Sequence, residues 1–530
     1  MSNSDIFIQG LERGWRVHDA SRLEQDLTLE ADIAIIGSGA GGATSAEILS
    51  AAGYKVLLIE EGGLFTSSDF RMQESEAYPT LYQEGLGRAS KDGAIIILQG
   101  RTVGGTTVVN WTSSFRTPEP TLQHWASEHG VVGHDHESMA PWFERMEKRL
   151  GVERWAMAPN ANNDVLRSGC EHLGLHWAVI PRNVRGCWNL GYCGQGCPTN
   201  AKQSMLVTSI PAMLDQGGEL LYLARAERLL LENDRVAGIE CVAMDERSVA
   251  PTGHRIQVRA RHYILAGGSI NSPALLMRSK APDPHQLVGK RTFLHLTTFS
   301  WAQFDRQINP FYGAPQSIYS DHFQWRDGTT GPMGYKLEVP PMQPGFSATV
   351  LGESGKDGAE LMAQLPNSNM LLALLRDGFH PDSASGTVEL RSDGSPVLDY
   401  QLTDYTRDGI RRSYLSMAEI QFAAGARLVK PVHRDAPAAR SMAEARQTID
   451  QLGIERFKAG LGSAHVMGGC PMGEDNRQAV TDSLGRHHQL ENLSIHDGSL
   501  FPTSIGANPQ LSIYGLTAKL SSLLAERLAS

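Results

Sequence analysis

Apolar runs separated by glycine-rich turns mark both ends of the chain. Residues 31–36 and 55–60 are largely apolar, which predicts two buried strands, and the segment 43–52 between them predicts a helix. A third apolar run at 257–266 predicts another strand that leads into a helix, and the apolar spacing over 511–524 predicts a helix near the carboxyl end. This order of elements is typical of an α/β domain.

The middle of the chain, between residues 299 and 402, shows a different pattern. Short alternating stretches at 346–351, 370–375 and 387–390 predict strands of an antiparallel sheet. We therefore expect the α/β part to be assembled from separated pieces of chain, with a substrate domain between them. Apolar residues of this region are candidates for a substrate pocket or for ordinary sheet core: Met333, Tyr335, Val339, Met342, Phe346, Leu361 and Met362.

A glycine motif between the first predicted strand and helix indicates a dinucleotide site. Gly37 and Gly39 allow a tight turn and close approach of the backbone to a pyrophosphate, whereas Gly42 lets helix and strand pack closely. The second strand ends in a carboxylate roughly 20 residues further on, where a ribose hydroxyl needs an acceptor. Its position favours Glu60 over Glu61 for this role.

A second glycine cluster at 100–111 is too polar and too rich in glycine for an interior strand. Its backbone N–H groups and small side chains are suited to wrap a phosphate or the edge of a flavin ring, where a larger side chain would collide. The candidate cofactor-binding residues of this loop are Arg101, Gly104, Gly105, Thr106 and Asn110.

The last seventy or so residues bring together an imidazole and a carboxamide, each next to glycine-rich turns: His465 and Asn508. A neutral imidazole with a pKa near its ordinary value of about 6.5 is suited to accept a hydroxyl proton at neutral pH. Asn508 can hydrogen-bond a substrate oxygen without competing for that proton. Together with a dinucleotide motif, the pair favours oxidation of an alcohol.

Composition excludes some classes of partner. The chain has 530 residues, enough for two domains, and its net charge of −10 argues against a nucleic-acid partner. Its first thirty residues lack the features of a secretory signal, so we expect a cytoplasmic protein. Six apolar residues near the start either touch a membrane surface peripherally or, as we favour, pack on the protein itself: Ile6, Phe7, Ile8, Leu11, Trp15 and Val17.

The glycine motif at 37–42, the loop at 100–110 and the segments at 266–273, 465–473 and 497–509 resemble the glucose-methanol-choline (GMC) oxidoreductase family in order and spacing. This resemblance covers nearly the whole chain. It implies a Rossmann-like FAD-binding domain beside an antiparallel-sheet substrate domain. FAD, a small-molecule alcohol, and oxygen or another electron acceptor are the implied cofactor and partners.

The resemblance also implies roles for individual residues. His465 takes the general-base position, with hydride transfer to flavin N5, and Asn508 takes the second active-site position. Asp497, Gly498 and Pro509 fall in the cofactor-binding segment. His295 falls where many relatives carry an Asp-His pair; Leu294 precedes it here, and we expect a structural role for it.

The implied domain division is discontinuous. Residues 1–30 form an N-terminal extension; 31–130, 200–298 and 461–530 form the FAD-binding domain; and 131–199 and 299–460 form the substrate domain with a cysteine-rich loop.

The cysteine-rich loop contains Cys187, Cys193 and Cys197 and leaves alternatives open. Three thiolates could hold a three-iron cluster, as in the sugar dehydrogenase branch of the family, which would make the protein a sugar or polyol dehydrogenase. Free thiols are favoured over a cluster or a disulfide, and we expect no metal site.

Residues 198–208 and 109–118 resemble instead the long-chain fatty alcohol oxidase branch and its bacterial relatives. That resemblance implies a hydrophobic substrate, a long-chain or aromatic alcohol. A flavin lyase of the same fold, which oxidises no alcohol, is the other alternative.

Overall fold

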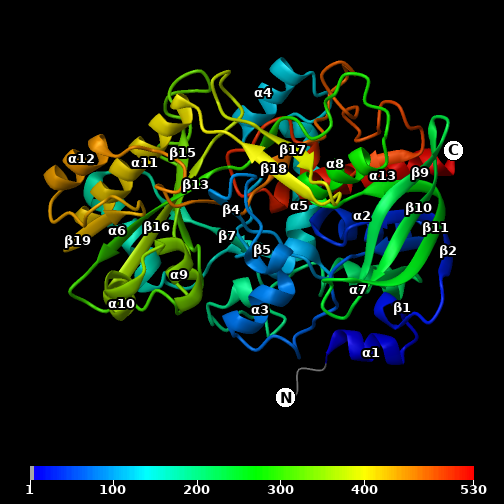
Figure 1. Cartoon of the computed structure of the whole chain (residues 1–530), viewed down its shortest axis with the longest axis horizontal. Coiled ribbons are helices and arrows are strands. Elements are labelled where there is room, and N and C mark those ends of the chain that lie inside the picture. Colours follow the sequence, from blue (N-terminus) through cyan, green and yellow to red (C-terminus); the bar gives the residue numbers. More distant parts are fainter. Residues whose placement is uncertain (1–4) are drawn as a thin grey trace.

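The computed structural model describes residues 5–530, and two large sheets at opposite ends of the molecule organise it (Figure 1). The first sheet has eight strands, of which β2 lies between β3 and β11 in parallel register, while β9, β10 and β11 form an antiparallel meander. Its strands are β1 (Arg16–Asp19), β8 (Glu219–Tyr222), β3 (Val56–Ile59), β2 (Leu27–Ile36), β11 (Pro251–Leu265), β10 (Arg235–Met244) and β9 (Ala224–Glu232), with β22 (Leu493–Ile495) beside β11.

Helices cover the first sheet and bury its apolar strands. The terminal helix α13 packs on both α2 and α5, and the core of this half includes the fully buried Ile33, Ile35 and Leu58. The helices of this half are α1 (Ile6–Glu12), α2 (Ala40–Ala51), α3 (Glu74–Leu81), α4 (Glu119–His129), α5 (His136–Leu150), α7 (Ser209–Asp215), α8 (Gly268–Arg278) and α13 (Gln510–Ala529).

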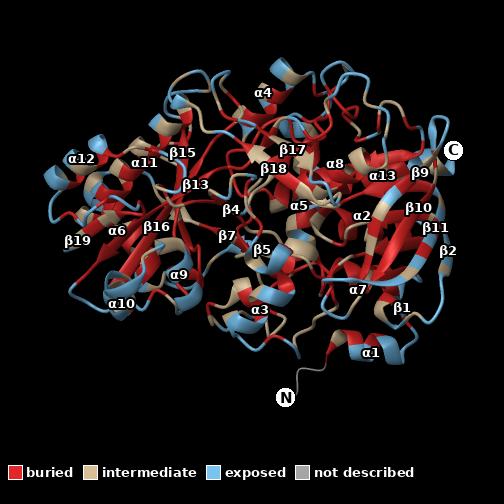
Figure 2. Ribbon diagram, in the orientation of Figure 1, coloured by how far each residue is buried: buried red, intermediate tan, exposed pale blue. Residues whose placement is uncertain are grey.

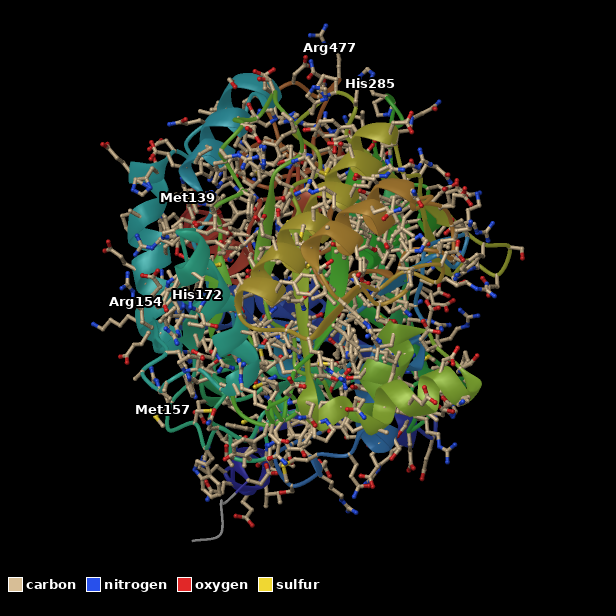
Figure 3. The ribbon with its side chains drawn as sticks, turned by 90° about the vertical axis from the view of Figure 1, so that its left-hand side faces the viewer. Met139, Arg154, Met157, His172, His285 and Arg477 are labelled. Atoms are coloured by element: carbon tan, nitrogen blue, oxygen red, sulfur yellow. The ribbon has the colours of Figure 1, made fainter. Side chains whose placement is uncertain are left out.

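The second large sheet is antiparallel apart from the pair β4 and β20. Helices α6, α11 and α12 lie over one side of it, and His172 on α6 is labelled in the side view (Figure 3). Its strands are β4 (Ile95–Ile97), β20 (Leu461–Ser463), β13 (Thr297–Gln303), β16 (Ser368–Leu375), β15 (Tyr335–Glu338), β14 (Ile318–Ser320), β6 (Ala178–Val179) and β19 (Leu428–Pro431). The helices of this half are α6 (Ala161–Leu173), α9 (Pro344–Leu351), α10 (Gly355–Ala363), α11 (Asp404–Ala423) and α12 (Met442–Gln451).

Two small sheets complete the fold. One contains β18 (Pro396–Tyr400), β17 (Gly386–Leu390), β12 (Thr292–Phe293) and β21 (Met467–Gly468), and the other pairs β5 (Val152–Arg154) with β7 (Pro181–Asn183). Burial is greatest in the strands of both large sheets and in the segments between them (Figure 2). The predicted strand at 387–390 corresponds to β17. It belongs to a small sheet and not to the large sheet of the substrate domain.

Most of the predicted elements are confirmed. The strands at 31–36, 55–60, 257–266 and 370–375 correspond to β2, β3, β11 and β16, and the helices at 43–52 and 511–524 correspond to α2 and α13.

The prediction of a strand at 346–351 is wrong, because this segment is helix α9. Pro344 occupies the first turn, where its fixed φ suits a helix, and Gly352 ends the helix in the left-handed region at φ 64°. Glu74 accepts hydrogen bonds from the backbone N–H groups of Gly345 and Phe346, at 2.6 and 2.7 Å. A carboxylate distant in the sequence thus caps the helix, and local apolar alternation does not reveal it.

The N-terminal segment is part of the first domain. Strand β1, which the sequence assigned to an extension, pairs in parallel with β8. Phe7 and Trp15 are buried and pack edge to face, whereas Ile8 and Leu11 are exposed. None of the helices described between residues 5 and 530 is long and apolar enough to span a membrane.

Candidate active site

A cavity of about 1390 Å³ is lined by residues of both large sheets. From the first sheet and its helices come the turn after β2, the end of β3 and the start of α8. From the second sheet come Phe299 on β13 and Leu372 and Leu374 on β16. His465 and Asn508 line the same cavity, so the two predicted catalytic residues and the predicted dinucleotide turn share one space.

The turn between β2 and α2 forms a narrow cradle. Gly37 has a φ of 102°, a conformation that favours glycine. Helix α2 begins after Gly39, which has no side chain to cap it, so its first N–H groups stay available for an anion. A Cβ on Gly42 would lie 1.8 Å from the carbonyl oxygen of Gly37. Gly42 thus lies outside the cavity wall and serves the close packing of helix and turn.

The second glycine loop packs directly on the first. The N–H of Gly104 donates to Ser38 Oγ at 2.9 Å, and a Cβ on Gly105 would lie 2.8 Å from Gly39 Cα. Thr106 Oγ1 accepts from the N–H of Gly100 at 3.0 Å, which closes this loop. Arg101 lines the cavity, and its buried Nε has no hydrogen-bond partner among residues 5–530. An unpaired guanidinium nitrogen in the cavity that also contains the free N–H groups of α2 is suited to an anionic group.

Glu60 lies at the end of β3, on the cavity wall, but its carboxylate is already engaged. It accepts from the N–H and the hydroxyl of Ser38 at 3.0 and 2.6 Å, and from the N–H of Gly62 at 2.9 Å. Burial raises its pKa. Glu61 also lines the cavity and accepts from Gln83 Nε2 at 2.6 Å. The structure therefore places both carboxylates beside the cradle, with Glu60 also holding the glycine turn.

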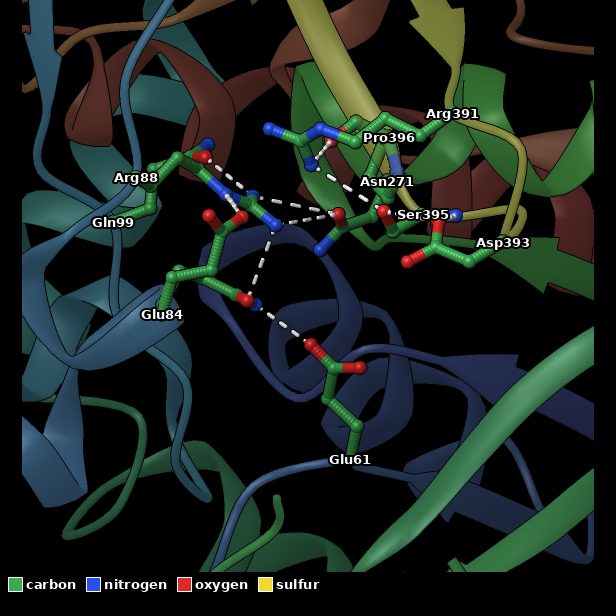
Figure 4. A network of polar contacts seen from close by, with 10 residues as sticks. Glu61, Glu84, Arg88, Gln99, Asn271, Arg391, Asp393, Ser395 and Pro396 are labelled. Carbon is green, nitrogen blue, oxygen red and sulfur yellow. Dashed lines mark hydrogen bonds and ion pairs between the residues drawn. The ribbon is translucent and has the colours of Figure 1, made fainter. Parts of the chain in front are cut away.

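A polar network ties the segment 83–99 to helix α8 (Figure 4). The buried Arg88 is its centre: it donates to Glu84, Gln83 and Gln99 at 3.1, 3.2 and 2.9 Å, and to Asn271 of α8 at 3.4 Å. All of these residues line the cavity. The network holds one wall of the cavity in place and was not predicted from the sequence.

Asn508, immediately before α13, is held by a buried ion pair. Its Oδ1 accepts from Lys336 Nζ at 3.2 Å, and its Nδ2 donates to Glu338 Oε2 at 3.0 Å. Lys336 and Glu338 are themselves 3.0 Å apart and almost fully buried on β15. Two residues separated by one position project from the same face of a strand, so β15 presents both partners to one amide.

His465 lies between β20 and β21, half-buried, with its imidazole beside that of His295. The Nδ1 atoms of the two rings are 3.1 Å apart. Burial and the charge of Lys336 lower the pKa of His465 to about 3. His465 is therefore neutral at pH 7, the state in which it can accept a proton.

The predicted cofactor-binding residues near the carboxyl end differ in their contacts. Asp497 accepts from the N–H of Gly268 and from Ser272 Oγ, at 2.8 and 2.6 Å, so it organises the start of α8. Gly498 and Pro509 line the cavity without such contacts. Asn110 lines the cavity and donates to Gln510 Oε1 at 2.8 Å.

The three cysteines of the 187–197 loop are free thiols, each half-buried. Cys193 Sγ lies 3.6 Å from Arg182, and Cys197 Sγ accepts from the N–H of Lys202 at 3.4 Å. Within residues 5–530, no three His, Cys, Asp or Glu side chains are arranged to hold a metal ion. The cluster alternative thus lacks a gathered ligand set in the described chain.

The cavity wall contributed by the second domain has an apolar part, besides polar residues such as Thr297, His433 and Lys458. Phe299, Leu372 and Leu374 line it, together with Trp111 and Phe346, whose rings pack edge to face at 6.1 Å. Of the apolar residues singled out between 333 and 362, only Phe346 lines this cavity. The others are buried sheet core or surround a small separate pocket: Met333, Tyr335, Val339, Met342, Leu361 and Met362.

Comparisons with known proteins agree with this geometry. Two family models, both described as GMC oxidoreductase, match residues 58–297 and 381–517. The long-chain-alcohol oxidase FAO4B of Arabidopsis thaliana is 29% identical over 94% of this chain and 68% of its own length. The long-chain-alcohol oxidase FAO1 of the same organism is 27% identical over 97% of this chain and 69% of its own length.

Solved structures show the same fold. A formate oxidase from Aspergillus oryzae superposes with a TM-score of 0.69 at 14% identity, covering 94% of this chain and 99% of its own. The pyridoxine 4-oxidase from Mesorbium loti superposes with a TM-score of 0.64 at 17% identity, covering 93% of this chain and 98% of its own.

Proposed function

This chain belongs to the GMC oxidoreductase family and is an FAD-dependent oxidoreductase that acts on alcohols. We propose that His465 and Asn508 form its reaction centre. The carrying observation is that both residues line the one cavity that also contains the glycine cradle. When bound, FAD supplies the acceptor for the hydride of the alcohol carbon. The residues of the chain bind and orient the alcohol and take its hydroxyl proton.

The cavity fits FAD in three respects. The N-terminus of α2 presents free N–H groups, and the buried Arg101 Nε lacks a protein partner among the described residues; both suit a pyrophosphate. Gly39, on which Gly105 packs closely, leaves the space that a closely approaching ligand needs. We infer that these residues, with Glu60 or Glu61 at the ribose, hold the cofactor.

Asn508 acts as a hydrogen-bond donor to the substrate oxygen. Its carbonyl oxygen faces the ammonium of Lys336, and one of its amide hydrogens faces the carboxylate of Glu338. The two contacts fix which way the amide points, because a flipped amide would place NH₂ against the ammonium. The second amide hydrogen is left for the oxygen that develops negative charge as His465 takes the proton.

Burial and, to a lesser degree, the charge of Lys336 keep His465 unprotonated, and this predicts a pH effect. His465 can accept the hydroxyl proton only when neutral, so activity falls as the pH drops through its pKa. With that pKa lowered to about 3, flavin reduction in the wild type should be independent of pH down to about pH 5. In Lys336→Met the loss of positive charge raises the pKa of His465, so the acidic limb of the pH profile moves to higher pH.

Stopped-flow measurement of flavin reduction across the pH range tests this shift. Because Lys336→Met leaves Glu338 buried without its partner, the double variant Lys336→Met with Glu338→Gln is the matched control. An unmoved acidic limb in the double variant would show that Lys336 does not set the protonation of His465.

We propose further that the substrate is a hydrophobic alcohol. The apolar wall of Phe299, Leu372 and Leu374 and the relation to long-chain-alcohol oxidases support this substrate class. Each buried methylene contributes about 0.8 kcal/mol, so kcat/KM should rise about threefold to fourfold per added carbon in a series of primary alcohols. The rise should end when the chain outgrows the apolar wall.

Anaerobic flavin bleaching by this series, followed by admission of air, measures the trend and identifies the acceptor. Fast recovery in air indicates an oxidase, and slow recovery indicates another acceptor. Phe299→Ser should flatten the dependence on chain length while short alcohols still react. Faster reduction by sorbitol or glucose than by hexanol would contradict the proposed substrate class.

A further inference from the structure

We propose that His295 is a positioning residue for His465: it accepts a hydrogen bond from Nδ1–H of His465 and thereby leaves Nε2 of His465 free to take the substrate proton. This inference rests on the proposed role of His465 as the base. It assigns to His295 a role beyond the structural one expected from the sequence.

The contact between the two rings is the first observation. The Nδ1 atoms are 3.1 Å apart, and two imidazole nitrogens at this distance share one hydrogen, so one ring donates and the other accepts. If His465 donates, its hydrogen is on Nδ1 and Nε2 has a free lone pair. If His295 donates, the hydrogen of neutral His465 is on Nε2, which then cannot accept a proton.

The second observation is the strained and rigid setting of His295. It is fully buried, and its backbone adopts a φ of 47°, which is uncommon for a residue other than glycine. Asp377 accepts from the N–H groups of Leu294 and His295 at 2.9 and 3.0 Å, and from Tyr400 Oη at 2.8 Å. These bonds hold the backbone from which the buried His295 ring extends to His465, as expected for a residue that orients another.

The surrounding charges keep His295 neutral. The charged or titratable groups that act on its ring are His465 and Lys336, while Asp377 is occupied by backbone N–H groups. Burial, reinforced by these two groups, lowers the pKa of His295 well below its ordinary value. A neutral His295 does not remove the proton from His465, but its lone pair stabilises the imidazolium formed when His465 accepts one.

The arrangement leaves one polar atom unpaired. His295 Nε2 is buried and has no hydrogen-bond partner among residues 5–530. In the proposed arrangement this atom carries the only N–H hydrogen of the neutral ring, because Nδ1 accepts from His465. An unpaired buried N–H lowers stability. The presence of His295 beside His465 is explained if its ring is needed to orient the proposed base.

The direct test is the tautomer of His465 in the holoenzyme, measured by ¹⁵N–¹H NMR of protein that contains ¹⁵N-labelled histidine. The signals of His465 are assigned by their loss in His465→Gln. We expect hydrogen on Nδ1 and a bare Nε2 in the wild type. In His295→Phe we expect a mixture of tautomers and flavin reduction about 10- to 100-fold slower. In His295→Asn, whose Oδ1 can accept from Nδ1–H and whose backbone tolerates positive φ, we expect partial recovery of both.

Hydrogen on Nε2 of His465 in the wild type would overturn the proposal. An unchanged tautomer in His295→Phe, despite slower flavin reduction, would also overturn it, because His295 would then have only a structural role. FAD content and thermal stability are measured for each variant; if His295→Phe does not fold, the wild-type spectrum and His295→Asn decide. Failure of every alcohol to reduce the wild-type flavin would refute the proposed function instead, and the tautomer measurement would still stand by itself.

Discussion

Replacing His465 by alanine is expected to slow flavin reduction by an alcohol about 10²- to 10⁴-fold, while FAD remains bound. The reason is that the alcohol must lose its hydroxyl proton as hydride leaves the carbon, and His465 is the neutral base on the cavity wall. Gly39 in the cradle and Arg101 in the second glycine loop are not altered by this substitution. The loss should therefore appear in the rate of flavin reduction and not in cofactor content.

Anaerobic stopped-flow absorbance measures that rate directly. His488→Ala is the matched control, since His488 is half-buried, bonds to the carbonyl of Gly473 and does not line the cavity. His465→Gln tests whether an amide of similar size restores the packing against His295 without restoring the rate. Near-normal reduction in His465→Ala with full FAD content would refute the assigned base.

The second large effect is expected at Gly39. A Cβ at this position would have Gly105 Cα as its nearest neighbour, 3.9 Å away, so the protein itself has room for it. The φ of −72° is also acceptable for other residues. Because Gly39 lines the cavity at the start of α2, the side chain of Gly39→Val would occupy space that the pyrophosphate needs. A clash of about 1–3 kcal/mol lowers FAD affinity roughly 5- to 150-fold.

Titration of the apoprotein with FAD, followed by flavin fluorescence, measures this affinity, and circular dichroism measures the stability of the apoprotein. Gly41→Ala is the matched control variant, for which we expect loss of apoprotein stability in place of a specific loss of FAD affinity. Its Cβ would lie 1.7 Å from the carbonyl oxygen of His496, so it should lower the melting temperature of the apoprotein. Unchanged FAD affinity in Gly39→Val would show that the cofactor does not approach this turn.

Local patterns were sufficient for elements whose shape depends on neighbouring residues. Gly37 reports a backbone conformation that favours glycine, and the apolar run at 31–36 reports burial on both faces of a sheet. The same reasoning failed at 346–351, where apolar alternation predicted a strand. That segment is a helix because Pro344 starts it and because Glu74, some 270 residues earlier, caps it.

Two parts of the reaction centre had no local signal. Lys336 and Glu338 occupy alternate positions in a short strand, and nothing in that strand shows that they face Asn508, 170 residues away. His295 resembles any other buried histidine until the fold brings it against His465. Glu60 was singled out for a ribose contact, and the structure adds that its carboxylate also holds Ser38.

The sequence by itself determined the family, the cofactor and two polar residues that line the cavity, because each depends on residue types in fixed local spacing. Only the tertiary structure decided what surrounds those groups: the ion pair that holds the amide of Asn508, the burial that lowers the pKa of His465 and the His295 ring that lies against it. The physical reason is that the directions of hydrogen bonds and the effects of charges depend on distances in space. Here those distances are set by strands and loops that lie far apart along the chain.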